Sequence, residues 1–439
     1  MAYYSAGDLG LNFFWQSVGF LLLFFYTDVI GLPNFVAGVV YAVGGFIDAI
    51  SDPAMGVLAD RTRTKKGRYR PYLLYGAAPL GLAFIMLFAV PLVAPASFVI
   101  IAAVTSHILF RLCYTAVSIP YSALGARLTF HARERTSLAG VRMLFGAFGG
   151  VAVVSLASHL RANFSDETAL IMTGLLAGFA GAGLIMLSYF CTKEWRIWDS
   201  DAAPTEKYAL RRVAGLLAAN TPFLVLIISV FMLTVANTII VKTVIYRFEY
   251  ILSAPSAGGL AMTLMTATPL VAIPLWVWTY LKLDKRPSFI LGCITVIAGL
   301  ALLYFTGGRF VAWALASYVI IAAGFSSFAV GFWSTLPDTI DYGHWKTGQR
   351  IESGLIGFAS AIQKTAIALS GIIVGFALDS FGYVAGVTQT PDTLNALHKF
   401  SSLIPLVLMT LSAATFSQFP LSAEKHRQLI KTIEKSSEY

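Results

Sequence analysis

The sequence predicts an all-α membrane protein with twelve transmembrane helices in two six-helix halves. Hydrophobic residues make up 57% of the 439 residues and charged residues only 12%, which excludes an ordinary soluble globular protein. The apolar stretches reach the roughly 20 residues that a helix needs to cross a bilayer. Short basic loops separate them, so the formal charge of +9 indicates membrane topology rather than a nucleic-acid partner.

Apolar runs between charged residues or Pro and Gly breaks predict the individual helices. The first run continues through apolar residues without a small-residue cleavage site, so we expect a membrane span rather than a signal peptide. The seventh is the weakest, because Lys242, Arg247 and Glu249 crowd its end. The predicted spans are 8–30, 33–58, 71–93, 97–123, 137–159, 167–191, 222–248, 257–281, 287–306, 310–335, 353–379 and 401–420.

Most of the 31 Lys and Arg residues fall in the loops after every second span and in the tail. By the positive-inside rule, this distribution places both termini in the cytoplasm. The longest polar stretch between spans, 193–215, is expected to link an N-terminal half (1–192) to a C-terminal half (216–424), with a cytoplasmic tail at 425–439. These segments are too short for a catalytic domain, so an enzyme is not expected.

Two aspartates, Asp48 and Asp52, lie four residues apart in the second predicted span. This spacing places both on one helix face. A carboxylate in hydrocarbon is costly unless it is paired, which makes the two a functional-site hypothesis. With Ser51 between them they offer the oxygen ligands of a hard cation, while their mutual repulsion would favour protonation of one. The pair therefore predicts a site for sodium or a proton; a structural salt bridge between spans is the alternative.

Further motifs are spread over most of the chain. They are GDLGLNFFWQSVGFLLLFFYTDVIGL, IDAISDPAMGVLADRTRTKKGRYRPYLLYG, YTAVSIPYSALGA with ERTSLAGVRM, and LPDTIDYGHWKTGQRIESG followed by AIQKTAIALSG. Together they resemble the glycoside–pentoside–hexuronide:cation symporter family, the melibiose-permease branch of the major facilitator superfamily. The resemblance implies the major facilitator fold and uptake of a sugar or glycoside with sodium, a proton or lithium. It also implies a monomer in the lipid of a bacterial inner membrane, with no cofactor besides the coupling cation.

The resemblance further implies which residues form the site. Two sugar-contacting acids of the melibiose permease correspond to Asn12 and Ser118, and an aromatic platform corresponds to Ser122, so the acidic clamp on a galactoside is absent. Arg111 is an additional positive charge relative to that permease. The cation ligands, and the metal ligands if sodium is the coupling ion, would be Asp48 and Asp52, with help from Ser51 and Thr115. The predicted substrate residues are Asn12, Asp48, Arg111, Ser118, Ser122, Arg142 and Lys364.

The three basic members of this set leave alternatives open. Lys364 lies deep in the eleventh span, where it would form either a structural pair with Asp48 or a pair that opens when cation or sugar binds. Arg142 could reach the cytoplasmic interface, and Arg111 could pack against backbone carbonyls. If all three face a cavity, three cations against two acids would favour an anionic sugar such as a hexuronide.

The basic loop RTRTKKGRYRP and the segment DTIDYGHWKTGQR are expected to form gates, although a solvated topology signal is the alternative for the loop. A second hypothesis for the whole protein is a carrier of a lipid or another non-sugar solute on the same fold. A membrane-embedded enzyme would need sizeable loops or a metal motif, and a sensor would need a signalling domain. We do not expect either, because the sequence shows none of these features. The predicted gating residues are Asp60, Arg61, Arg68, Arg70, Asp341 and Lys346, with Asp338 and Glu352 as counter-charges.

Overall fold

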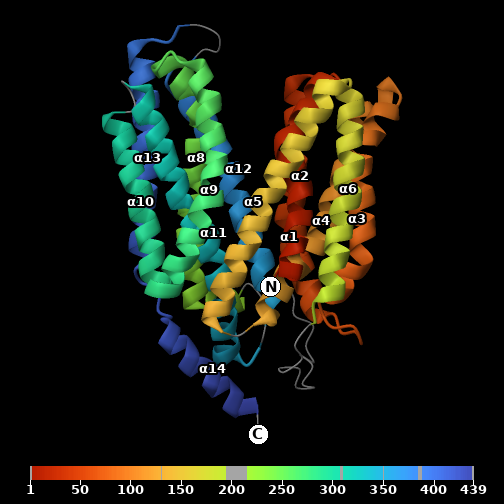
Figure 1. The fold of residues 1–439 in the computed structure, drawn as a ribbon, viewed down its shortest axis with the longest axis vertical. Coiled ribbons are helices and arrows are strands. Elements are labelled where there is room, and N and C mark those ends of the chain that lie inside the picture. The colour runs from red at the N-terminus through yellow and green to blue at the C-terminus, as the bar shows by residue number, and fades with distance from the viewer. Residues whose placement is uncertain are drawn as a thin grey trace. The chain divides into compact units, whose positions relative to one another are not determined.

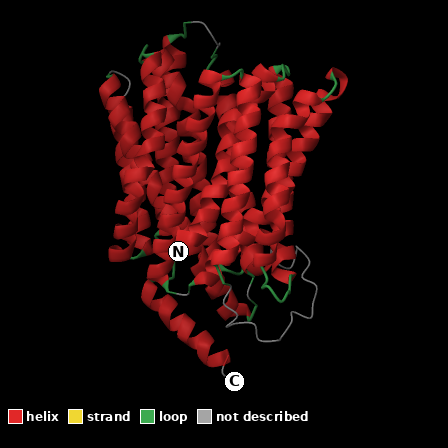
Figure 2. Cartoon of the chain, turned by 45° about the vertical axis from the view of Figure 1, so that its right-hand side comes forward, coloured by secondary structure: helices red, strands yellow, loops and turns green. Residues whose placement is uncertain are grey.

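The computed structural model describes residues 2–129, 131–193, 215–306, 310–349, 351–383 and 388–437. Helices make up nearly all of this described chain (Figure 2), and its β pairing is limited to a single bridge between Thr64 and Gly67. Eleven of the described helices are long and apolar enough to cross a membrane. Helices satisfy their own backbone hydrogen bonds, which hydrocarbon requires. The predicted all-α membrane class is confirmed.

The chain divides into two compact units. Unit 1 comprises Met1–Leu216, Thr347–Ala361 and Ser436–Tyr439, and unit 2 comprises Leu217–Lys346 and Ile362–Lys435. The helix that contains Ala361, α12 (Glu352–Ser380), therefore contributes its first turns to unit 1 and its remainder to unit 2.

Unit 1 is built on the first six long helices of the chain (Figure 1). α1 packs against α5 and α6, while α3 packs against α4 and α6, and α2 packs against α4. A Cβ at Gly10 would meet the carbonyl oxygen of Gly181 at 2.6 Å, so small residues allow α1 and α6 to approach closely. The elements are α1 (Ala2–Phe24), η1 (Phe25–Val29), α2 (Asn34–Arg61), α3 (Arg70–Val93), η2 (Ala96–Phe98), α4 (Val99–Leu128), α5 (Ala132–Asn163) and α6 (Asp166–Cys191).

Unit 2 repeats one feature of unit 1, since its first long helix also ends in a five-residue π-helical turn. The side chain of Asn220 caps α8 by accepting a hydrogen bond from the Phe223 amide. α8 and α10 both pack against α13. The elements are α8 (Thr221–Tyr246), η3 (Arg247–Ile251), α9 (Pro255–Leu283), α10 (Lys285–Phe305), α11 (Val311–Thr347), α13 (Pro391–Phe416) and α14 (Ala423–Ser437).

The largest differences from the sequence prediction lie in the C-terminal half of the chain. α13 starts at Pro391 rather than at 401, because Thr390 caps it and proline suits the first helical turn. α11 continues to Thr347, so most of the predicted gate segment is helical. The tail at 425–439 was expected only as a tail, but it forms α14, on which Leu429 and Ile433 are buried.

Candidate functional site

Asp48 and Asp52 lie in the middle of α2 and are both buried, with exposed fractions of 1% and 0%. Their predicted placement on one face of the helix holds, since helix α4 supplies a partner to each of them. Arg111 contacts Asp48, and Thr115, one turn later, contacts Asp52. The acid pair of α2 therefore meets a polar face of α4.

The contact to Asp48 is an ion pair. The Nη1 atom of Arg111 lies 2.9 Å from Oδ2 of Asp48, and both side chains are buried. The guanidinium also lies over the Trp15 ring, 5.4 Å from its centroid. Arg111 is thus held by a carboxylate and an aromatic face, not by backbone carbonyls as the structural alternative supposed.

His107 fixes the other edge of this guanidinium. The Nε atom of Arg111 donates to Nε2 of His107 at 3.1 Å. Because an Nε–H is always a donor, Nε2 must accept, so the imidazole is neutral and carries its proton on Nδ1. That Nδ1 lies 3.1 Å from the Val40 carbonyl oxygen, which accepts its hydrogen bond. Gly44 makes the space: a Cβ there would come within 2.6 Å of His107 and 2.8 Å of Arg111.

Asp52 accepts hydrogen bonds from two hydroxyl groups. Thr115 donates to Oδ1 at 2.7 Å, and Ser360 of α12 donates to Oδ2 at 2.6 Å. Ser51 donates in turn to the Thr115 hydroxyl at 3.4 Å. Ser360 was not predicted, because nothing local in the sequence connects it to a carboxylate 308 residues away.

Glycines bring the start of α12 close enough for this contact. A Cβ at Gly56 would collide with the Ser353 carbonyl, and a Cβ at Gly357 would collide with the Asp52 carbonyl. The two backbones therefore cross where neither helix carries a side chain. This crossing lies one turn before Ser360, which explains how so short a side chain reaches Asp52.

Arg142 pairs with an acid that the sequence analysis missed, Asp8 of α1. Its Nε and Nη2 atoms lie 2.7 and 3.1 Å from the two carboxylate oxygens, a bidentate arrangement that fixes both groups. Tyr121 donates to the same carboxylate at 2.8 Å, and its ring stacks on Tyr4. Arg142 is 5% exposed, so it does not simply reach an interface. Asp8 lies one turn before Asn12, and this spacing was the signal available in the sequence.

The neutral members of the predicted substrate set follow the same helix faces. Asn12 is half-buried and donates from Nδ2 to the Asp8 carbonyl at 2.9 Å. Ser118 and Ser122 are half-buried one and two turns beyond Thr115, at spacings that extend the polar face of α4. Lys364 is half-buried on α12 but belongs to unit 2, and its predicted contact with Asp48 stays a prediction.

These ionised groups form one cluster in unit 1. The hydroxyl of Tyr114 is within electrostatic range of Asp8, Asp48, Asp52 and Arg111. Two of the three acids form ion pairs with arginines, Asp8 with Arg142 and Asp48 with Arg111.

The predicted gating residue Asp60 caps the start of α12. Its carboxylate accepts from the backbone amides of Ser353 at 3.0 Å and Gly354 at 2.7 Å, where the helix dipole favours an anion. The Tyr69 hydroxyl lies 2.6 Å from Asp60 and 2.8 Å from Glu352. Burial, then the two nearby acids, raises the pKa of Tyr69 well above its usual value, so it stays a donor.

The counter-charge Glu352 also forms an ion pair with Arg127 of α4. The basic residues of the loop are less uniform. Arg61 is exposed, Arg68 is half-buried, and Arg70 donates to the Tyr189 carbonyl at 3.1 Å while it covers that ring. The structure thus gives partners to Asp60, Glu352 and Arg70, and their gating role stays a prediction.

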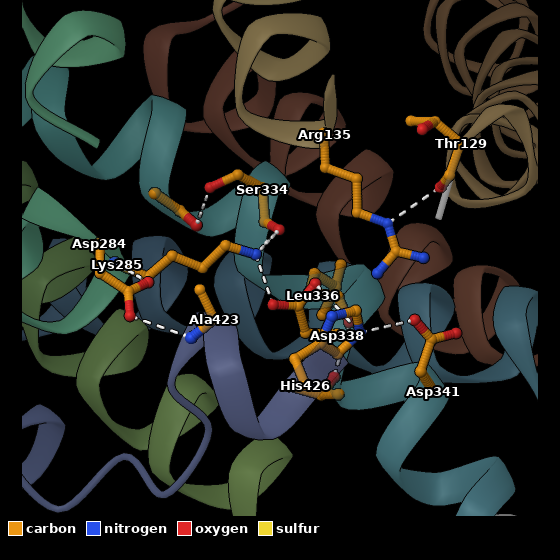
Figure 3. Close-up of polar contacts among 12 residues, drawn as sticks. Thr129, Arg135, Asp284, Lys285, Ser334, Leu336, Asp338, Asp341, Ala423 and His426 are labelled. Atoms are coloured by element: carbon orange, nitrogen blue, oxygen red, sulfur yellow. Dashed lines mark hydrogen bonds and ion pairs between the residues drawn. The ribbon is translucent and has the colours of Figure 1, made fainter. Parts of the chain in front are cut away.

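A second acid pair lies in unit 2, on α11 (Figure 3). Asp338 forms an ion pair with Lys285, which also donates to the Ser334 carbonyl at 2.7 Å. Asp341 lies 2.9 Å from Nε2 of His426, a buried residue of the tail helix α14. His426 also lies 3.7 Å from Asp338.

Asp284 and Lys346 make further contacts in unit 2. Asp284 accepts from the amides of Lys285 at 2.7 Å and Ala423 at 3.0 Å, so it also joins the start of α14 to α10. Lys346, a predicted gating residue, donates to the Ala219 carbonyl at 2.8 Å. Asp341 and Lys346 therefore contact different segments, the tail helix and the residue before the cap of α8.

Comparisons with known proteins agree with this architecture. The family model of the MFS/sugar transport proteins matches residues 3–423. The chain is 31% identical over 437 residues to the "uncharacterized symporter YnaJ" of Bacillus subtilis (strain 168), covering 98% of this chain and 93% of that protein. It is 27% identical to the isoprimeverose transporter of Lactiplantibacillus pentosus, covering 93% of this chain and 86% of that one.

Solved structures show the same fold. The MFS proton:xylose symporter XylE bound to 6-bromo-6-deoxy-D-glucose superimposes with a TM-score of 0.68, covering 98% of both chains. Its sequence identity is 15%, so this likeness concerns the fold alone. The predicted major facilitator fold is confirmed.

Proposed function

Because the chain belongs to the MFS/sugar transport protein family, a family of transporters and not of enzymes, we propose that it is a secondary active symporter. It moves a sugar or glycoside together with a cation by alternating access. The observation that carries the proposal is the buried carboxylate of Asp52, which accepts from the hydroxyls of Thr115 and Ser360 beside two buried aspartate–arginine pairs. A net charge in hydrocarbon is costly, so cation binding and the movement of the loaded protein are coupled.

The residues of the cluster take separate roles in this proposal. Asp52, with the hydroxyls of Ser51 and Thr115, receives the coupling cation. Neutralising Asp52 weakens the hydrogen bond that it accepts from Ser360. Cation binding therefore changes a contact between α2 and α12. Charge-assisted hydrogen bonds are roughly twice as strong as neutral ones, so this contact depends on the cation.

Sugar recognition falls to the adjoining polar faces. Asn12, Ser118 and Ser122 offer donors and acceptors for hydroxyl groups, beside the pair of Asp8 and Arg142. Such faces suit sugars, because amide and hydroxyl side chains both donate and accept. Lys364, on the later turns of α12, stays a predicted substrate residue.

Charge balance bears on the class of sugar. With Asp8 included, the predicted substrate and cation residues hold three acids against Arg111, Arg142 and Lys364, not two against three. The excess of positive charge that favoured a hexuronide is absent, and a neutral sugar or glycoside fits better. A carboxylate substrate would need one of the arginines to leave its aspartate.

The remaining assignments follow from the family and from the loop charges. We place the protein in a bacterial inner membrane with both termini in the cytoplasm, since the basic loops lie on that side. It works as a monomer among membrane lipids and needs no cofactor besides the coupling cation. Asp60 at the start of α12, with Arg61, Arg68 and Arg70, and Asp341 and Lys346 in unit 2, would form the cytoplasmic gates.

Radiolabelled uptake into vesicles tests the proposal. A panel of neutral glycosides and hexuronides is offered under separately imposed sodium and proton gradients. Uphill accumulation of one sugar under one gradient is the expected result. Failure of every sugar to exchange, even in gradient-free counterflow, would reject sugar transport and leave a lipid or other solute as the cargo.

A further inference from the structure

The predicted cation site fits a sodium ion poorly, because a guanidinium already contacts Asp48. The Nη1 atom of Arg111 lies 2.9 Å from Oδ2 of this carboxylate. Hard cations surround themselves with several oxygen ligands, whereas arginine offers five N–H donors and no acceptor. Arg111 therefore occupies an oxygen that sodium would need and contributes no ligand in return.

The position of Arg111 is fixed from several sides. His107 accepts from its Nε atom, Trp15 lies against its face, and Gly44 leaves the space for both side chains. The neutral tautomer of His107 is itself held by the Val40 carbonyl. Since a guanidinium keeps its proton in proteins, the positive charge at Asp48 is permanent.

We propose that Arg111 acts as a tethered cation at Asp48 and makes transport by this protein independent of sodium. The inference rests on the proposed function, cation-coupled sugar uptake, and assigns to Arg111 the choice of coupling ion. Asp52, Ser51 and Thr115 still offer oxygens, but with Asp48 held by Arg111 only one of the two predicted carboxylate ligands is left for a metal ion. Of the two predicted coupling ions, the proton is the one that remains.

The experiment measures the ion directly and separately from sugar transport. Purified wild-type protein is titrated with radioactive sodium, and its thermal unfolding is compared in sodium and in choline at equal ionic strength. We expect neither saturable sodium binding nor a sodium-specific rise in Tm. Saturable sodium binding by the wild-type protein would overturn the inference. Uphill sugar uptake by the wild-type protein under a sodium gradient would also overturn it.

Substitutions at Arg111 test the cause. Arg111→Gln removes the charge and is expected to gain sodium binding and sodium-stimulated uptake by about tenfold, because Asp48 then becomes available. Arg111→Lys keeps the charge and should stay insensitive to sodium. Arg247→Gln is the matched control, since Arg247 is also fully buried but lies in unit 2, where it donates to Ser401 and Ser402.

The outcomes distinguish this inference from the proposed function. Sugar counterflow without any gradient tests sugar transport, and the sodium titration tests Arg111 whether or not a sugar is found. If Arg111→Gln folds, shown by a cooperative thermal unfolding transition, and still ignores sodium, Arg111 is not the determinant and the inference fails. If that variant does not fold, the wild-type titration and Arg111→Lys decide: sodium binding by either contradicts the inference.

Discussion

Each of the two units carries a buried pair of aspartates on one long helix, and the two pairs have similar contacts. In α2, Asp48 forms an ion pair with Arg111, and Asp52 follows one turn later. In α11, Asp338 forms an ion pair with Lys285, and Asp341 follows three residues later. In both pairs the first acid forms an ion pair with a basic residue of a neighbouring helix.

The difference lies in what faces the second acid. Asp52 accepts from the hydroxyls of Thr115 and Ser360, which can donate or accept as the charge requires. Asp341 faces His426, a buried side chain on the separate helix α14. The α2 pair is thus suited to a change of charge at one carboxylate, while the α11 pair is suited to holding a helix in place.

The comparison also separates the two histidines. His107 accepts a hydrogen bond from Arg111 and is neutral, so it orients the cation of its pair. His426 contacts the acids themselves. Two aspartates, a basic residue and a histidine therefore recur in both units, and the partner of the second acid distinguishes the proposed cation site from the contact that holds α14.

Asp48→Asn should have the largest effect on stability, because it leaves Arg111 buried without its carboxylate. Removing one partner of a buried ion pair costs about 3–5 kcal/mol. The double variant Asp48→Asn/Arg111→Gln should recover most of that loss, since no uncompensated charge is left. Denaturant or thermal unfolding in detergent measures both. Equal destabilisation by the single and double variants would show that the ion pair is not what holds α2 to α4.

Asp52→Asn should leave the fold intact and abolish driven uptake. The amide can still bond to the hydroxyls of Thr115 and Ser360, but it cannot gain or lose a charge. A driving force of about 100 mV supports roughly 50-fold accumulation, and this variant should lose all of it while it retains counterflow. Asp341→Asn is the matched variant in the other pair and should keep driven accumulation. If both variants lose it, the proposed division of roles between the two pairs is wrong.

Asp338→Asn should lower the free energy of unfolding by less than Asp48→Asn does. Lys285 is the first residue of α10 and keeps the carbonyl of Ser334, so its charge is not left without an acceptor. Losing a hydrogen bond to a charged group costs about 1.5–3 kcal/mol. Unfolding of the two aspartate variants under identical conditions gives the ranking. A larger loss for Asp338→Asn would indicate that the α11 pair is the more deeply buried of the two.

The sequence predicted the helices and their polar faces well, because the 3.6-residue period fixes which residues share a face. It placed Asp48 and Asp52 together on α2, and Thr115 beside them on α4 through the family resemblance. It could not identify partners on other helices: Asp8 for Arg142, and Ser360 for Asp52, depend on helix packing over 134 and 308 residues. Periodicity determines a face but not the helix that covers it.

The tail helix α14 is a second case in which the sequence contained the pattern of a packed face but did not identify the partner of that face. The sequence analysis expected only a cytoplasmic tail at 425–439, although His426, Leu429 and Ile433 recur at helical spacing and are all buried. That pattern was available in the sequence and predicts one packed face. What the pattern could not supply was the acid pair against which His426 lies.

His426→Ala should have the smallest effect, confined to α14. The variant removes the contact to Asp341 but leaves the Asp284 cap and the buried Leu429 and Ile433. A lost hydrogen bond of about 1 kcal/mol corresponds to roughly fivefold more frequent opening of the helix. Limited trypsin digestion at Lys425 and Arg427 measures this opening.

The exposed neighbour Gln428 provides the control, since Gln428→Ala changes the same helix without touching an acid. Digestion of His426→Ala should be about fivefold faster than that of Gln428→Ala, with counterflow unchanged in both. Equal digestion rates would mean that Leu429 and Ile433 alone hold α14 in place. The contact between His426 and Asp341 would then not stabilise α14. The similarity between the acid pairs of α11 and α2 would be limited to one ion pair in each unit.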